Sequence, residues 1–172
     1  MALNSCSMAS GFLLQYIKLK LPFQYNPVDD TINCMTSQSH KKHRRILYIE
    51  DDPSNRQLVR LLLDMRPNLE LVEAETAEEG LKLALHNPFD SILLDLNFPD
   101  ISGYEVLGEL QSSQLHKTTP VIAVSGDNMP DDIERGKQAG FFAYLTKPLD
   151  ALELSALLDH IFASMDEGPV HK

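Results

Sequence analysis

Five side chains that could act together in chemistry stand at or just after the ends of four apolar runs in this 172-residue chain. They are Glu50, Asp51, Asp95, Ser125 and Lys147. Carboxylates that lie close together repel one another unless a cation neutralises them, and an oxygen-only cluster without histidine or cysteine suits Mg²⁺. A lysine and a hydroxyl group beside them would complete a site for a tetrahedral anion, because Mg²⁺ and lysine share the charge of a phosphoryl group during transfer.

Two aspartates in the segment LLDLNFPD could receive such a group. Asp95 ends an apolar run directly, so we expect it to lie between the other polar side chains. Asp100 stands five residues further on, past Pro99, where proline and aspartate favour a turn. We predict that Asp95 is the reacting residue and that Asp100 shapes the turn.

The elements that must position these residues alternate along the chain. We expect strands at 45–50, 69–75, 89–96, 120–126 and 142–147. We expect helices at 52–67, 76–87, 102–113, 130–140 and 149–162. Alternating strands and helices form a parallel sheet with right-handed crossovers. The predicted fold class is α/β, a doubly wound (βα)₅ arrangement with a five-stranded parallel sheet and helices on both faces.

Helix boundaries are marked by capping signals. We expect Asp52 to be the N-cap of the first helix, with Pro53 at its first position. Capping boxes are expected at Thr76/Glu79 and Ser102/Glu105, a helix start at Asp150 and a helix end at Gly140. For the first helix, the predicted buried stripe consists of Leu58, Leu61, Leu62 and Met65.

The acidic balance argues against nucleic acid as a partner. Residues 1–44 contain five Lys or Arg and two Asp, a net charge of +3, so the other 128 residues carry −13 of the total of −10. Such a domain repels phosphates, and could instead suit a cation or a basic protein surface. Both cysteines, Cys6 and Cys34, precede this domain, so we predict neither a disulfide framework nor a cysteine metal site.

We predict a cytoplasmic protein without membrane insertion. The apolar runs fall short of the roughly 20 residues of a membrane span, and the start of the chain lacks the basic region of a signal peptide. Residues 1–44 are interpreted as a flexible N-terminal extension or linker, 45–165 as the domain and 166–172 as a short tail. Because that tail is too short for a second domain, we expect the chain to act by binding another protein or by passing on a phosphoryl group, without DNA binding.

Four motifs resemble the receiver domain of two-component response regulators. They are YIEDDPSN, ILLDLNFPDISG, VIAVSGD and YLTKP, and the resemblance covers about residues 45–163. Ser125 lies 30 residues after Asp95 and Lys147 lies 52 after it, so all four motifs stand in the family's order and spacing. Each motif alone is weak, but their conjunction is specific. The resemblance implies a flavodoxin-like fold with strand order 2-1-3-4-5.

The resemblance implies that Asp95 takes a phosphoryl group from a phosphohistidine of a partner. That partner would be a sensor histidine kinase or a histidine phosphotransfer protein, and a downstream protein target would read the result. Mg²⁺ is the implied cofactor. Asp51 would bind it directly together with Asp95, Glu50 would help through water, and Asn97 would contribute its backbone carbonyl.

The resemblance also implies a switch. Ser125 would bond a phosphoryl oxygen after transfer, and Lys147 would pair with another. Tyr144 matches the aromatic residue that turns inward when the hydroxyl group moves. The bond between Lys147 and Pro148 is the family's usual site for a cis peptide. Such a protein is not an enzyme in the ordinary sense, since it promotes only its own phosphorylation and dephosphorylation.

Several alternatives remain open. The chain could be a free-standing regulator or a receiver derived from a hybrid sensor kinase, and it contains no kinase motif. A pseudo-receiver would serve only as an interaction module, although its acidic, hydroxyl and lysine positions are intact here. A phosphatase of the haloacid-dehalogenase type would need a second aspartate where Asn97 stands. Phe142 and Ala143 replace acids that are common in the family, so partner specificity cannot be taken from other members.

Overall fold

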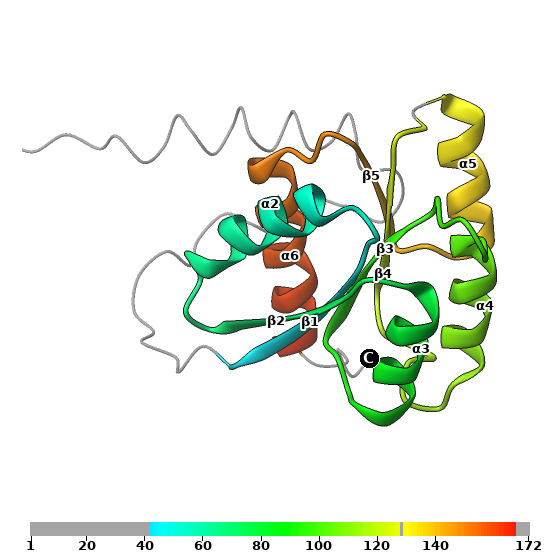
Figure 1. The fold of residues 1–172 in the computed structure, drawn as a ribbon. Helices are drawn as coiled ribbons and strands as arrows, with labels where there is room; N and C mark the ends of the chain where they lie inside the picture. The colour runs from blue at the N-terminus through cyan, green and yellow to red at the C-terminus, as the bar shows by residue number, and fades with distance from the viewer. Residues whose placement is uncertain (1–41, 128, 168–172) are drawn as a thin grey trace, which may run out of the picture. The chain divides into compact units, whose positions relative to one another are not determined.

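The described residues form one parallel sheet flanked by five helices (Figure 1). The computed structural model describes residues 42–127 and 129–167. The strands are β1 (Arg44–Ile49), β2 (Leu69–Ala74), β3 (Ser91–Asp95), β4 (Val121–Ser125) and β5 (Ala143–Thr146). The helices are α2 (Pro53–Asp64), α3 (Ala77–His86), α4 (Gly103–Ser112), α5 (Pro130–Ala139) and α6 (Ala151–Asp166).

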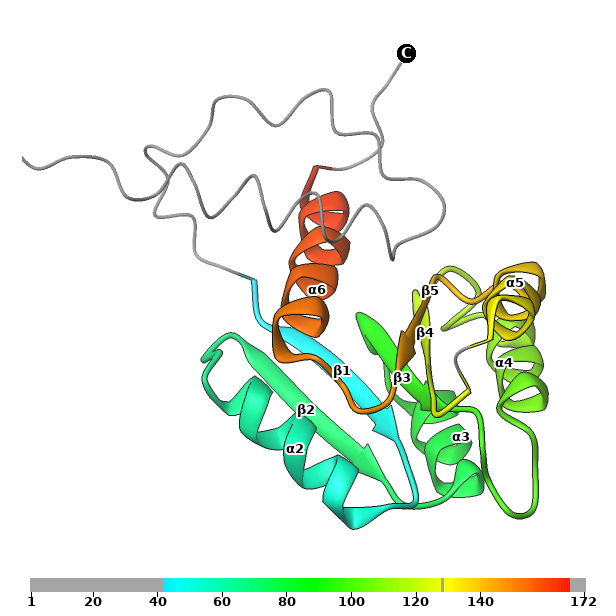
Figure 2. The ribbon, with the colours of Figure 1, turned by 90° about the horizontal axis from the view of Figure 1, so that it is seen from above.

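The sheet has the order β2-β1-β3-β4-β5, and all four strand pairs are parallel. Helices α3, α4 and α5 cover one face, and α2 and α6 cover the other (Figures 1 and 2). The predicted fold class and the strand order implied by the resemblance are confirmed. Of the predicted extension over residues 1–44, residues 1–41 lie outside the described residues and Arg44 is the first residue of β1, and the domain boundaries at 45 and 165 stay predictions.

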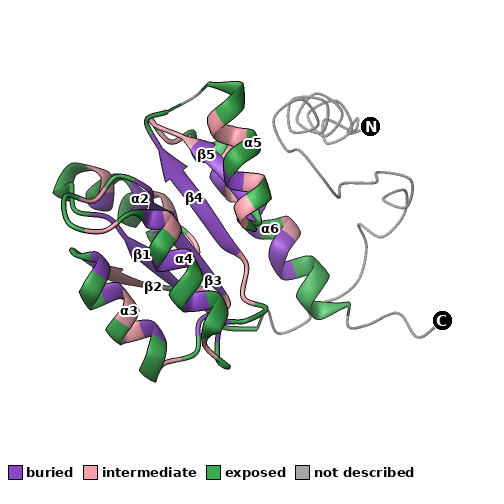
Figure 3. Cartoon of the chain, turned by 90° about the vertical axis from the view of Figure 1, so that its right-hand side faces the viewer, coloured by how far each residue is buried: buried purple, intermediate pink, exposed green. Residues whose placement is uncertain are grey.

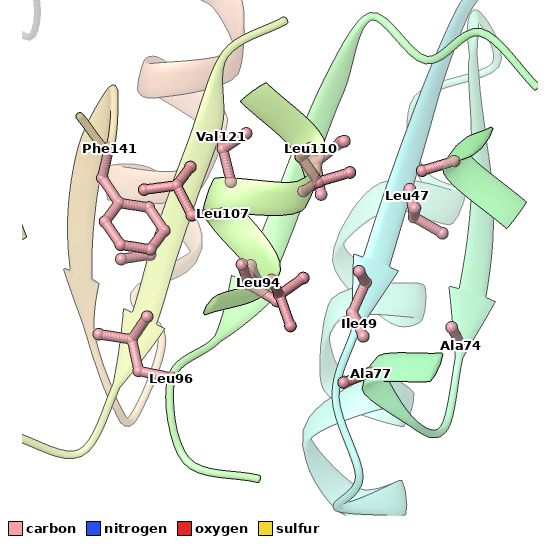
Figure 4. Packing of buried hydrophobic residues seen from close by; sticks show 14 of the residues in the cluster. Leu47, Ile49, Ala74, Ala77, Leu94, Leu96, Leu107, Leu110, Val121 and Phe141 are labelled. Atoms are coloured by element: carbon pink, nitrogen blue, oxygen red, sulfur yellow. The ribbon is translucent and has the colours of Figure 1, made fainter. Parts of the chain in front are cut away.

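The central strands are apolar because helices cover them on both faces. Every residue of β3 and β4 is buried, and Figure 3 shows β4 buried along its length while the helices expose their outer sides. Leu94 lies beside α4 and belongs to the same buried cluster as Leu107 and Leu110 (Figure 4). Ile49 of β1 lies toward α3, beside Ala77. The site residues thus emerge from the most constrained part of the molecule.

The predicted stripe of α2 is wrong. Leu61 and Met65 are 60% and 84% exposed, and the buried positions of this helix are Arg56, Val59 and Leu63. Apolar residues occupy more than one helical stripe here, so periodicity alone does not select the buried one. The position of the sheet selects the buried stripe, and the helix begins at Asp52, whose side chain accepts a hydrogen bond from the Ser54 N–H.

Most of the predicted caps are confirmed. Ser102 and Glu105 form a complete capping box, and Gly140 ends α5 with a φ of 100°. Thr76 caps α3 by accepting from the Glu79 N–H, but the Glu79 carboxylate accepts from the N–H of Glu75 instead of that of Thr76. The N-caps fix where these helices leave the edge of the sheet that carries the polar residues, and Gly140 ends α5 before the start of β5.

Candidate phosphoryl and metal site

Glu50 follows β1 directly, and its side chain is fully buried. Its Oε2 accepts a hydrogen bond from the Tyr48 hydroxyl at 2.8 Å, and its Oε1 accepts one from Asn55 Nδ2 at 3.0 Å. Burial alone would raise the pKa of Glu50, but hydrogen bonds from Asn55, Lys147 and Tyr48 hold it below its ordinary value. Glu50 is therefore an ionised carboxylate with both oxygens engaged.

Asp95 is the last residue of β3 and is 2% exposed. Its Oδ1 accepts a hydrogen bond from the N–H of Asn97 at 3.1 Å, and its Oδ2 lies 2.7 Å from Lys147 Nζ. Burial raises the pKa of Asp95 and outweighs these two hydrogen bonds, and the charge of Glu50 acts in the same direction. The environment of Asp95 thus disfavours an unneutralised charge.

Lys147 joins the two buried carboxylates. Its Nζ lies 2.8 Å from Oε2 of Glu50 and 2.7 Å from Oδ2 of Asp95. Its backbone N–H donates to the carbonyl of Ser125 at 2.8 Å, which fixes the end of β5 beside the end of β4. The peptide bond to Pro148 is cis, as the resemblance implied.

Three carboxylates form a cluster whose chemistry fits a divalent cation. One oxygen each of Glu50, Asp51 and Asp95 lies within 4.8 Å of the others. Against the single cation of Lys147, the three carry a formal surplus of two negative charges. Asp51 is the exposed member, and it is the one best placed to meet an ion from solvent. An all-oxygen donor set of this kind suits Mg²⁺.

A hydroxyl group lies on the other side of Asp95. Ser125 is fully buried, and its Oγ accepts hydrogen bonds from the N–H of Asp127 at 3.1 Å and from Asn97 Nδ2 at 3.4 Å. Tyr144 is 8% exposed, and its hydroxyl donates to the carbonyl of Asp127 at 3.1 Å. Burial raises the pKa of Tyr144, so its phenol stays a donor.

The structure brings together the residues that the sequence singled out. Glu50, Asp51, Asp95 and Lys147 form one cluster, with Ser125 linked to it through Asn97. The roles of the Asn97 carbonyl as a ligand and of Tyr144 as a switch stay predictions. Asp100 is exposed and is not among the three carboxylates that the described residues gather here.

Three supporting residues were missed. Arg56 donates to the backbone carbonyls of Glu50 at 2.8 Å and Asp51 at 2.9 Å, and also to the Glu75 carboxylate at 2.8 Å. Asn55 and Tyr48 hold the Glu50 side chain, as described above. The period of two in a strand places Tyr48 on the same face as Glu50, so this pair had a signal in the sequence.

Gly103 allows α4 to begin against the end of β3. A Cβ atom at this position would lie 2.6 Å from the carbonyl oxygen of Asp95 and 2.7 Å from Cα of Leu96. The Gly103 N–H donates to the Leu96 carbonyl at 3.2 Å. A larger residue would push the helix away from the backbone that carries Asp95, so the site depends on this close approach.

This arrangement can bind a tetrahedral anion beside a carboxylate nucleophile. Lys147 supplies a fixed cation, Ser125 supplies a hydroxyl group, and Asp51 faces solvent where an ion could enter.

Among the described residues, no helix is both long enough and apolar enough to cross a membrane.

Comparisons with known proteins agree with this geometry. A family model described as the response regulator receiver domain matches residues 46–159. The cell cycle response regulators CtrA of Brucella ovis and Brucella anthropi are each 39% identical over 117 residues, which cover 68% of this chain and 49% of theirs. The chain therefore spans about half the length of the curated relatives it matches.

Two solved structures are similar to this chain over nearly their whole length. The chemotaxis protein CheY4 of Vibrio cholerae is 27% identical with a TM-score of 0.64, over 69% of this chain and 98% of that one. The receiver domain of the sensor histidine kinase PA1611 from Pseudomonas aeruginosa is 26% identical with a TM-score of 0.64, over 70% and 98%. That structure has a magnesium ion coordinated in its active site cleft.

Proposed function

The chain belongs to the response regulator receiver domain family, and from that premise we propose that it accepts a phosphoryl group on Asp95 in a two-component phosphorelay. The donor is a phosphohistidine on a sensor histidine kinase or a histidine phosphotransfer protein. The observation that carries the proposal is the environment of Asp95: a buried carboxylate at a strand end, 2.7 Å from Lys147 and within the acidic cluster.

The reaction exchanges one bond to phosphorus for another. A carboxylate oxygen of Asp95 attacks the phosphorus and forms the O–P bond, while the N–P bond to the donor histidine breaks and its electron pair stays on the imidazole nitrogen. In hydrolysis, water attacks the phosphorus, phosphate leaves and the Asp95 carboxylate is restored. Apart from this cycle the protein turns over no substrate, so it is not an ordinary enzyme.

Lys147 pairs with a phosphoryl oxygen and leaves Glu50 and Asp95 as it does so. Its Nζ already lies against the acceptor carboxylate, so a small movement suffices. Mg²⁺, held by Asp51 and Asp95 with the Asn97 carbonyl and with Glu50 acting through water, would neutralise phosphoryl charge when bound. Lys147, together with the cation when it is bound, would offset the repulsion between the incoming anion and the three acids.

Ser125 and Tyr144 respond to the new phosphoryl group. Ser125 donates its hydroxyl to a phosphoryl oxygen, which moves Oγ away from the N–H of Asp127. Tyr144, bonded to the carbonyl of Asp127, follows that movement and changes the surface around α5 and β5. A single added charge thereby biases a two-state element.

The output is the binding of a downstream protein or relay of the phosphoryl group, without DNA binding by this domain. The acidic charge of the chain supports a protein partner over nucleic acid. We place the protein in the cytoplasm, where a partner kinase domain would meet it.

The test is phosphorylation by a small donor. The protein is incubated with acetyl phosphate and Mg²⁺, and its intact mass is measured. We expect a gain of about 80 Da, the mass of one phosphoryl group, which is lost in Asp95→Asn and kept in the control Asp100→Asn. An unmodified wild-type protein would point to an interaction module instead, and steady release of phosphate from phosphoesters would point to a phosphatase.

A further inference from the structure

Tyr48 is a buried tyrosine whose hydroxyl group donates its hydrogen bond to a buried carboxylate, which is an unusual acceptor for a phenol. The ring is fully buried in β1, and the O–H donates at 2.8 Å to Oε2 of Glu50, two residues later on the same face of the strand. A buried phenol usually finds a hydrogen-bond partner, but many acceptors could serve. Here the partner is a fully buried carboxylate of the acidic cluster.

The Glu50 carboxylate is held from three directions. Tyr48 donates to Oε2, Asn55 donates to Oε1, and Lys147 Nζ lies within 2.9 Å of both oxygens. Asn55 comes from the first turn of α2 and is partly exposed, and Lys147 is shared with Asp95. Of these three donors, Tyr48 is the one fixed in a central strand and committed to Glu50.

We propose that Tyr48 is a positioning residue of the metal and phosphoryl site, which acts through Glu50. Its hydroxyl fixes the carboxylate at the end of β1, and that carboxylate in turn positions Lys147 beside Asp95 and would help to hold Mg²⁺ through water. The inference rests on the proposed function. It adds a group outside the acidic cluster to the residues that determine affinity for the cation.

Packing alone does not require the hydroxyl group. The Tyr48 ring is fully buried, and phenylalanine keeps the same ring. The oxygen atom is what reaches Glu50, so Tyr48→Phe separates the two roles. Partners that orient the ligands of a metal typically change metal affinity by 10–100-fold when they are removed.

The experiment measures Mg²⁺ affinity by calorimetry on the full chain. We expect Tyr48→Phe to bind Mg²⁺ about tenfold more weakly than wild type, at the low end of that range because Asn55 and Lys147 still hold Glu50. Tyr104→Phe is the matched control: its ring packs edge-on against Phe141, outside the site, and its affinity should equal that of wild type. Circular dichroism verifies that each variant is folded.

A double-mutant cycle with Glu50→Ala distinguishes positioning from packing. If Tyr48 acts through Glu50, adding Tyr48→Phe to Glu50→Ala should change Mg²⁺ affinity by less than about twofold, within the usual error of additivity. A full tenfold loss in that background would overturn the inference. So would a Tyr48→Phe variant that binds Mg²⁺ as wild type does, and both results leave the proposed function standing. Absence of Mg²⁺ binding by the wild type would instead overturn the proposed function itself.

Discussion

Lys147→Met removes the ammonium group that lies between two buried carboxylates. Glu50 and Asp95 have side chains that are 0% and 3% exposed, and Lys147 Nζ lies within 2.8 Å of each. Without the ammonium group, the two negative charges face each other across a site that water barely reaches. Methionine keeps the length and apolar stem of lysine, so the change isolates the charge.

The expected loss of stability is about 3 kcal/mol. Removing one partner of a buried ion pair costs about 3–5 kcal/mol, because the remaining charge is left uncompensated. The low end applies here, since the Lys147 side chain is itself 21% exposed and Asp95 can relieve the repulsion by taking up a proton. The free energy of unfolding of a single domain is about 5–15 kcal/mol, so this loss is a large share of it.

Urea unfolding in EDTA measures the effect, with Lys137→Met as the matched control. Lys137 pairs with Glu134 at 3.6 Å on the surface of α5, and surface pairs contribute about 0–1 kcal/mol. The cost of Lys147→Met should shrink at acid pH, where Asp95 is protonated. A cost no larger than that of the control near pH 7 would refute the view that both buried carboxylates are charged in the folded protein.

Three further predictions concern packing, pH and the cation. Gly136→Ala should lower the free energy of unfolding in urea by about 1–3 kcal/mol, because its Cβ would lie 2.8 Å from Cδ2 of Tyr144. The Cβ of Gly108→Ala meets nothing within 4 Å, so this control should raise it by about 0.5–1 kcal/mol. Equal effects of the two substitutions would refute this prediction. The pKa of Asp95 is raised above its ordinary value of 3.8. The protonated carboxyl group therefore contributes to the free energy of unfolding below pH 3.8, and this contribution is lost as the pH rises through the raised pKa. Asp95→Asn should therefore gain stability relative to wild type as the pH rises above about 4 and through the raised pKa, and a pH-independent difference would contradict the sign. Mg²⁺ at about 100 times its Kd should add about 2.7 kcal/mol to the unfolding free energy, and Asp51→Asn should lose most of this gain while keeping its stability in EDTA.

Much of the fold could be predicted because the deciding signals are local. Asp52, Ser102 and Gly140 mark helix ends through bonds to their own neighbours, and the structure places each cap where the sequence did. The stripe of α2 could not be predicted in this way. Leu61 and Val59 are equally apolar, and only the position of the sheet decides that Val59 is buried.

The site residues that end the strands could be predicted, because the carboxyl ends of parallel strands share one edge of the sheet. That rule brought Asp95 and Lys147 together although 52 residues separate them. The rule does not reach residues that act on backbone atoms. Arg56 resembles an ordinary solvated arginine in sequence, and its bonds to the carbonyls of Glu50 and Asp51 exist only once α2 has docked.

The measurement that tests the central claim most directly is the position of the phosphoryl group. The protein is phosphorylated with acetyl phosphate, reduced with borohydride so that an aspartyl phosphate becomes homoserine, and mapped by tandem mass spectrometry of its peptides. We predict homoserine at position 95, and aspartate unchanged at positions 51 and 100. Homoserine at either of those positions, or at none, would contradict the assignment of Asp95 as the acceptor.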